Sequence, residues 1–150
     1  MISCFLIRHA HAGTRGASDD DRRELTARGR AQSNALADRL VDTGILTIVT
    51  SPFRRCVQTV EPLAAALGLP IDHDDQLAEG AGTHRALSLI EHTEHPLALC
   101  SHGDIIGDVM NTLSRRGVVL DDHRVAKASA WVLTVEDGTV TGAHYIGPSE

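Results

Sequence analysis

Short apolar runs spaced along the chain restrict its possible folds more than any other feature of the sequence. They cover residues 2–7, 46–50 and 97–100, and Ile71 begins a further short segment of this kind. The runs are mostly apolar rather than alternating, which is typical of strands buried on both faces of a parallel sheet. Such a sheet needs helices on both sides to cover it.

The segments between these runs carry the helices that this arrangement requires. Helices are expected from Thr26 to Gly44, from Ser51-Pro52 to about Leu67, from Thr83 to Ile90 and from Gly103 through Leu113. Pro62 falls inside the second of them and predicts a local irregularity. Asp137-Gly138 separates two strand-like segments, residues 129–135 and 140–146, and predicts a hairpin turn. We therefore expect residues 1–150 to form one α/β domain, a three-layer sandwich whose mostly parallel sheet ends in an antiparallel hairpin.

The charge balance limits the partners that this protein can have. The formal net charge of −6 repels the phosphate backbone of nucleic acids and anionic membrane surfaces, so neither is expected as a partner. An anion must therefore be bound in a local basic pocket. All but one of the 14 basic residues are arginine, the exception being Lys127. Arginine presents a planar pair of donors that suits carboxylate and phosphate oxygens.

Cysteine usage indicates the compartment. Cys4, Cys56 and Cys100 are odd in number and have no metal-ligand spacing, which argues against a disulfide framework and favours a reducing environment. The first apolar run is too brief for a signal-peptide core or a membrane span. We expect a cytoplasmic protein.

Polar residues follow the predicted strands directly. They are Arg8-His9, residues 51–55, residues 77–79 and Ser101-His102-Gly103. Because ligands of such sheets bind at the carboxyl ends of the strands, we expect these residues to lie close together. The helix that starts at Gly103 directs unpaired backbone N–H groups towards this edge, which favours a phosphate. Arg55 would complete this pocket, unless it is a solvated arginine at a helix start.

Four separated stretches resemble the motifs of one family. Residues 6–10 (Leu-Ile-Arg-His-Ala) resemble an Arg-His-Gly signature, residues 25–32 a first-helix pattern, residues 51–59 a Ser-Pro-x-x-Arg-Ala-x-Gln-Thr segment and residues 101–103 a second histidine motif. In this order they resemble the histidine phosphatase superfamily, which includes phosphoglycerate mutases and acid phosphatases. The resemblance covers most of residues 2–110 and implies the phosphoglycerate mutase-like α/β fold.

The resemblance also implies roles for individual residues. His9 would attack phosphorus and become a phosphohistidine, which water then hydrolyses, with neither metal nor cofactor. Arg8, Arg55 and His102 would hold the phosphoryl oxygens, beside the backbone of Gly103. The cationic neighbours of His9 disfavour its protonation and keep a ring lone pair free.

Two further residues have two readings each. Arg23 matches an arginine that reaches phosphate in the short branch of the family, and it equally fits an ion pair with residues 19–21. Glu79 matches the family's Leu-x-Glu position, where it would protonate a leaving group, and it equally fits a solvated loop carboxylate. Both readings stay open from the sequence.

The sequence narrows the substrate to a class rather than to one compound. The span from Glu79 to Leu97 is too short for the helical insert that roofs the mutase active site, so an open pocket is expected. An open pocket suits a bulky substrate with a good leaving group, as in the SixA-type phosphohistidine phosphatases that this short chain resembles. The alternatives are a small phosphorylated metabolite, which would be hydrolysed as a phosphomonoester, and a phospho-ligand that is bound without turnover.

Two residues beside His9 depart from simple expectations. Ala10 replaces the usual glycine of the signature and would narrow the approach to His9. His9 and His11 have the spacing of a metal-binding pair, but no cluster of further ligands appears at the expected spacings, and the chain is too short for the barrel in which such pairs occur. His11 is expected at the rim of the pocket.

Overall fold

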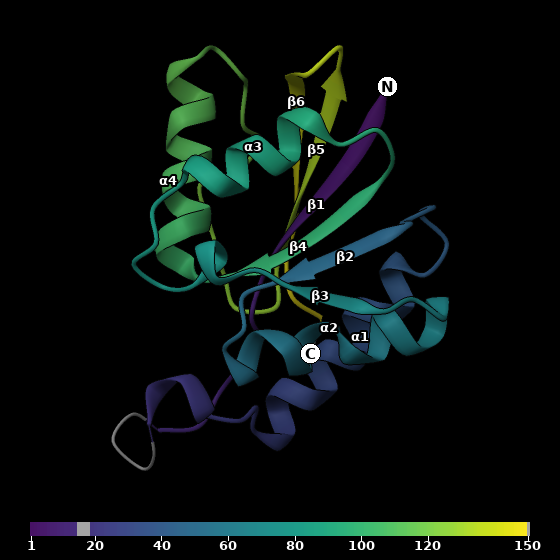
Figure 1. The fold of residues 1–150 in the computed structure, drawn as a ribbon, viewed down its shortest axis with the longest axis vertical. Coiled ribbons are helices and arrows are strands. Elements are labelled where there is room, and N and C mark those ends of the chain that lie inside the picture. Colours follow the sequence, from purple (N-terminus) through teal and green to yellow (C-terminus); the bar gives the residue numbers. More distant parts are fainter. Residues whose placement is uncertain (15–18, 150) are drawn as a thin grey trace.

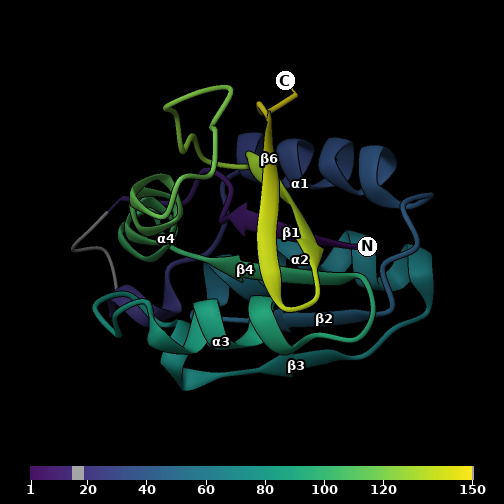
Figure 2. The same cartoon turned by 90° about the horizontal axis from the view of Figure 1, so that it is seen from above.

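The computed structural model describes residues 1–14 and 19–149 and contains one mixed sheet (Figure 1). Its strands are β1 (Ile2–Arg8), β2 (Thr47–Thr50), β3 (Ile71–His73), β4 (Leu97–Ser101), β5 (Ala130–Glu136) and β6 (Thr139–Ile146), arranged in the order β3-β2-β4-β1-β5-β6. The four strands β1 to β4 are parallel, whereas β5 is antiparallel to both of its neighbours. The sheet twists strongly, so that β6 crosses the direction of β3 (Figure 2). The predicted parallel sheet with a C-terminal hairpin is confirmed.

Helices cover both faces of the sheet, as the apolar runs predict. Helices α1 (Ala27–Leu40) and α2 (Arg54–Leu67) pack on one face, and α3 (His84–His92) and α4 (Gly103–Arg115) pack on the other (Figure 1). Within β1, Leu6 packs in the core that contains α3 and α4, whereas Phe5 and Ile7 pack in the core that contains α1 and α2. The central strands are therefore buried on both sides, which explains why they lack an alternating pattern. Within the described residues, no helix is long and apolar enough to cross a lipid bilayer.

Two helix ends differ from the expected positions. Helix α1 ends at Leu40 rather than at Gly44, which lies in the following turn with a φ of +85°. Helix α2 begins at Arg54 rather than at Ser51-Pro52. The Ser51 hydroxyl accepts from the N–H of Phe53 at 3.3 Å and from Nε2 of His102 at 2.8 Å, just ahead of the helix. Helix α2 continues through Pro62, and the hairpin turn at Asp137-Gly138 forms where it was expected. Both hairpin residues have a positive φ, which is the conformation of the tight turns that favour Asp-Gly.

Polar side chains of α1 and α2 hold the segment that follows β1. The N–H of Ala10 donates to Thr59 at 2.9 Å, and the N–H of His11 donates to Gln32 at 3.0 Å. The N–H of Leu25 donates to Gln58 at 2.8 Å. These contacts satisfy backbone donors that have no strand partner. The polar residues Gln58 and Thr59 of the motif at residues 51–59 therefore help to fix the chain that follows His9.

Gly29 in α1 lies against the same segment. A Cβ atom at this position would be 2.0 Å from the carbonyl oxygen of His11, which is backbone and cannot move aside cheaply. Gly107 in α4 provides a contrast, because a Cβ atom there would meet no atom within 4 Å. Helix α1 therefore approaches the segment after β1 as closely as it does only because residue 29 has no side chain.

We predict opposite effects for alanine at these two helical glycines. Gly29→Ala should destabilise the protein by about 2 kcal/mol or more, because the backbone at His11 must shift. Gly107→Ala should stabilise it by about 0.5–1 kcal/mol, because alanine loses less conformational entropy in a helix. Urea denaturation of the two variants and the wild type measures both changes. Similar midpoints for the two variants would contradict the close approach at Gly29.

Candidate active site

The segments that follow the parallel strands meet at one edge of the sheet, as expected. The strand ends are in register, with Arg8 opposite Ser101 and Thr50 opposite Cys100. A cavity of about 320 Å³ lies at this edge. It is lined by Arg8, His9, Arg23, Arg55, Glu79, Gly103, Asp104 and Lys127. Six of the seven residues that the sequence singled out line this cavity, and the seventh, His102, lies directly beside it.

His9 is buried at the base of the cavity, with 6% of its surface exposed. Its Nδ1 atom lies 2.8 Å from the carbonyl oxygen of Ala10. A carbonyl can only accept, so Nδ1 must carry the proton, which leaves the lone pair of neutral His9 on Nε2. Nε2 makes no hydrogen bond with any described residue. The ring therefore has its nucleophilic nitrogen free.

The surroundings of His9 keep it neutral. Burial lowers its pKa to about 3, and the positive charges of Arg55 and Arg8 and the neighbouring His102 act in the same direction, against a smaller opposing effect of the bond to Ala10. Desolvation is the largest cause, ahead of the cationic neighbours that the sequence indicated. The expected direction is thus found, with burial as its main origin.

Arg8 is held between two fixed groups. Its Nη1 donates to the carbonyl oxygen of Val125 at 2.7 Å, while its guanidinium lies against Gly103 at the start of α4. A Cβ atom at position 103 would be 2.9 Å from Cζ of Arg8, so a glycine is needed for this approach. The Nε atom of Arg8 is buried and has no hydrogen-bond partner among the described residues. A buried donor of this kind costs free energy unless something accepts from it.

Arg55 is nearly fully buried, with 1% of its surface exposed, and lies at the centre of the polar contacts. It donates from Nη1 to the backbone carbonyl of Asp20 at 2.8 Å, and its Nη2 lies 3.3 Å from the carboxylate of the same residue and 3.5 Å from that of Glu79. The alternative of a solvated arginine is therefore wrong. Its Nε, like that of Arg8, is buried without a partner in the described part of the chain.

The ion pair expected for Arg23 is present, whereas its contact with phosphate stays a prediction. Arg23 lines the cavity, and its Nε donates to the Asp20 carboxylate at 3.0 Å while its Nη1 donates to the carbonyl oxygen of Gly13 at 2.7 Å. Asp20 therefore bridges Arg23 and Arg55. Its carboxylate fixes two guanidinium groups at the edge of the same cavity.

His102 connects the cavity to the sheet. Its Nδ1 lies 3.3 Å from Nη2 of Arg55, which can only donate, so Nδ1 accepts and Nε2 carries the proton of the neutral ring. That Nε2 donates to the Ser51 hydroxyl at 2.8 Å. The ring centroids of His102 and His9 are 5.6 Å apart. His102 thus fixes Arg55 directly, and its expected contact with phosphoryl oxygens stays a prediction.

Glu79 lies at the outer part of the cavity with its side chain 37% exposed. Its carboxylate lies 3.5 Å from Nη2 of Arg55, so it belongs to the charged lining of the cavity, and its role as a general acid stays a prediction. Between Glu79 and β4 the chain forms only the short helix α3, in keeping with the expected absence of a roofing insert.

Two neighbours of His9 take other places than expected. His11 is bonded through Nδ1 to the hydroxyl of Thr26, the N-cap of α1, at 2.7 Å and does not line the cavity. Ala10 is fully buried in a small cluster with Ala12, Leu25 and Ala128, so its methyl group does not narrow the cavity.

Sequence reasoning missed two residues of the site, Asp104 and Lys127, and it did not foresee that Asp20, expected only as a partner of Arg23, also pairs with Arg55. Asp104 was not assigned a role, although a carboxylate in the first turn of a helix is common. Asp104 accepts from the N–H of Gly80 at 2.8 Å and so ties the loop after Glu79 to α4. Lys127 belongs to none of the motifs, and its only signal was that it is the single lysine of the chain.

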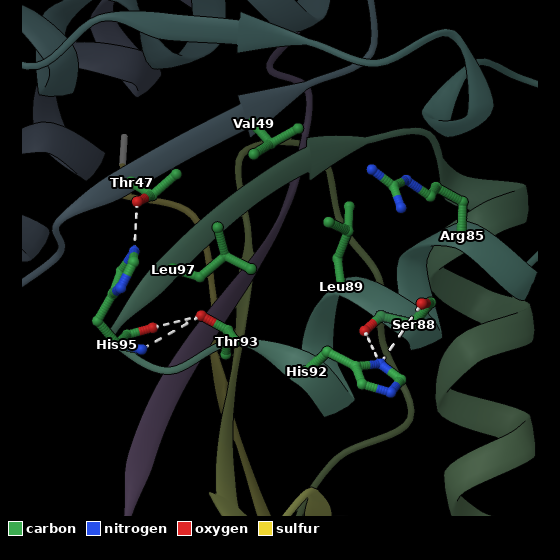
Figure 3. Close-up of a pocket in the computed structure, with 9 residues that line it drawn as sticks. All are labelled: Thr47, Val49, Arg85, Ser88, Leu89, His92, Thr93, His95 and Leu97. Atoms are coloured by element: carbon green, nitrogen blue, oxygen red, sulfur yellow. Dashed lines mark hydrogen bonds between the residues drawn. The ribbon is translucent and has the colours of Figure 1, made fainter.

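A second cavity, of about 220 Å³, lies at the opposite edge of the sheet. Thr47 and Leu97, the first residues of β2 and β4, line it together with α3 (Figure 3). Nε2 of His95 is hydrogen-bonded to the hydroxyl of Thr47, and Nδ1 of His92 lies 2.8 Å from the carbonyl oxygen of Ser88. This hollow is at the amino ends of the strands and shares no residue with the cavity at His9, so the two are separate features.

Sequence comparison relates the chain to known phosphatases. Residues 4–94 match the model of the histidine phosphatase superfamily (branch 1). An 8-oxo-(d)GTP phosphatase of Mycolicibacterium smegmatis is 34% identical over 155 aligned residues, which cover 97% of this chain and 48% of that protein. The chain thus spans about half the length of this relative. The interpretation of residues 1–150 as a single domain stays a prediction.

Solved structures share the fold at low sequence identity. A SixA from Agrobacterium tumefaciens has a TM-score of 0.79 at 20% identity and covers 99% of both chains. The protein histidine phosphatase SixA in complex with tungstate has a TM-score of 0.75, also at 20% identity, and covers 98% of this chain and 96% of its own. The chain has the SixA-type fold, and the family match, which includes both His9 and the helix that carries Arg55, shows that it belongs to the histidine phosphatase superfamily.

Proposed function

We propose that this protein is a phosphatase that uses His9 as its nucleophile and needs no metal ion. The observation that carries the proposal is a neutral, buried His9 beside two buried arginines. Among the described residues, neither the Nε2 lone pair of His9 nor the Nε–H donors of Arg8 and Arg55 have a partner. Phosphoryl transfer requires mainly positioning and stabilisation of charge on the phosphoryl oxygens, which buried guanidinium groups supply.

The reaction would proceed in two displacements. His9 Nε2 attacks phosphorus, a P–N bond forms, and the bond from phosphorus to the leaving group breaks, with its electron pair going to the leaving group. Water then attacks the phosphohistidine, the P–N bond breaks, and inorganic phosphate leaves. Arg8, Arg55, Arg23 and His102 would hold the phosphoryl oxygens through both steps, with the backbone of Gly103 at the start of α4. Glu79 would protonate a poor leaving group in the first step.

Protein phosphohistidine is the substrate that we propose first. Its ring nitrogen is a good leaving group once protonated. The partly exposed side chain of Glu79 and the short connection from Glu79 to β4 support an open site that admits a protein surface. A small phosphorylated metabolite is the second candidate. The similarity over nearly the whole chain to an 8-oxo-(d)GTP phosphatase favours a nucleoside phosphate within that class.

The compartment belongs to the same proposal. The free and buried thiols of Cys4, Cys56 and Cys100 support a reducing environment, and we propose the cytoplasm.

Loss of the nucleophile should abolish turnover. We expect His9→Gln to lower kcat for an aryl phosphate in excess chelator by a factor on the order of a thousand or more, because no neighbouring group can take its place. Wild-type protein quenched in alkali during turnover of a labelled phosphate ester should carry the label on His9. His84→Gln, at an exposed histidine outside the cavity, is the control. Unaltered turnover in His9→Gln would contradict the proposal. If the wild type binds phosphate or vanadate but hydrolyses no substrate, the protein is a phospho-ligand binder.

Glu79 should matter only when the leaving group is poor. We expect Glu79→Gln to slow hydrolysis of an alkyl phosphate by about a hundredfold or more, the usual range for a general acid, and to slow hydrolysis of a phosphohistidine protein far less. Steady-state kinetics on both substrates measure the difference. Equal losses on the two substrates would remove the acid role from Glu79.

The protonation state of His9 can be observed directly. Since its pKa is lowered to about 3, the ring should remain neutral, with the proton on Nδ1, from pH 8 down to pH 5, whereas an ordinary histidine becomes charged near pH 6.5. Nitrogen-15 NMR of the imidazoles, with His9 assigned by its absence in His9→Gln, reports the state. A His9 ring that gains a proton between pH 8 and pH 5 would contradict the desolvated site.

A further inference from the structure

We propose that Lys127 forms a second anion-binding subsite at the rim of the cavity, which takes a phosphate group adjacent to the one that is transferred. The proposal rests on the function proposed above and makes its substrate class narrower. It selects compounds that carry two neighbouring phosphates, such as the diphosphate or triphosphate ester of a nucleoside.

The backbone around Lys127 is fixed against the strand that carries the nucleophile. The N–H of Ala128 points at the carbonyl oxygens of Arg8 and His9, at 3.1 and 3.2 Å. Ala128 is buried and has a φ of +62°, a left-handed conformation that residues other than glycine rarely adopt and that tends to persist at functional sites. The chain therefore accepts local strain to hold residue 127 over the end of β1.

The side chain of Lys127 lies near several like charges, in a cavity that Glu79 and Asp104 also line. Burial lowers the pKa of Lys127, and the nearby guanidinium groups of Arg8, Arg23 and Arg55 lower it further. Unlike Arg23 and Arg55, which are paired with Asp20, Lys127 makes no hydrogen bond or ion pair with any residue that the structure describes. A cation held beside other cations without a carboxylate partner is unfavourable unless an anion binds between them.

The depth of the cations separates two positions for anions. His9 and Arg55 are buried at the base, where the Nε–H donors of Arg8 and Arg55 have no partner among the described residues and so can serve the oxygens of one phosphoryl group. Lys127 is exposed and lies at the rim of the same cavity. Its ammonium group is a point charge on a flexible stem, which suits a group whose distance from the base varies. In the proposal, a phosphate next to the reacting one extends from the base towards this ammonium group.

Two phosphonates test the subsite, because their P–C bonds resist hydrolysis. Methylphosphonate offers one charged group, and methylenediphosphonate offers two. Their dissociation constants are measured by calorimetry on the wild type, Lys127→Met, Lys127→Arg and Arg124→Met. Arg124→Met is the matched control, since Arg124 lies in the same segment and loses the same charge, but pairs with Asp122 outside the cavity.

We expect methylenediphosphonate to bind the wild type more tightly than methylphosphonate. Lys127→Met should weaken binding of the diphosphonate by about tenfold and that of the monophosphonate by a clearly smaller factor. Lys127→Arg should retain most of the preference, and Arg124→Met all of it. Equal losses for both probes in Lys127→Met, no loss for either, or the same effect in Arg124→Met would overturn the subsite. Turnover of an aryl phosphate by the wild type that depends on His9 tests the proposed function separately.

Discussion

The parallel pairing of β1 and β2 with the central strand β4 is the constraint on which the rest of the structure depends. The register places Arg8 opposite Ser101 and Thr50 opposite Cys100, so the three strands end side by side. The residues that follow them are therefore brought together whatever the loops do. His9, Arg55 and His102 come from three distant parts of the sequence, and this register makes them neighbours.

Burial of charge at this edge gives the site its chemistry. Burial lowers the pKa of His9 and keeps its ring neutral. The bond from Nδ1 to the carbonyl oxygen of Ala10 leaves the lone pair on Nε2. Arg55 could not be buried alone, because an unpaired charge in the interior is costly. Asp20 and Glu79 compensate it from the outer side, while His102 accepts from its inner side. The same packing at the strand ends thus keeps His9 out of water and holds the charged arginines beside it.

The sequence predicted the site better where a residue adjoins a strand. The sequence placed Arg8, His9 and Gly103 in the site because they lie at or just after strand ends. Strand ends are set by neighbouring residues and by burial, which a local pattern can show. Arg23 and Glu79 lie in longer connections, so the sequence left two readings for each. The structure shows the ion pair of Arg23 with Asp20 and places both Arg23 and Glu79 at the cavity. Contact of Arg23 with phosphate and the acid role of Glu79 are proposals. Helix ends were also less certain: α2 begins only at Arg54, although the hydroxyl of Ser51 accepts from the N–H of Phe53 as well as from His102.

By itself the sequence determined the layers of this protein, the parallel strands and the edge at which chemistry is placed, because these depend on apolar runs and on helix and turn signals that act over a few residues. Only the tertiary structure decided that Lys127 lies at the same cavity. Its position depends on the N–H of Ala128 reaching the carbonyl oxygens of Arg8 and His9, more than 100 residues earlier in the chain. No local pattern specifies a hydrogen bond between segments so far apart, and such a contact becomes visible only once the sheet has brought them together.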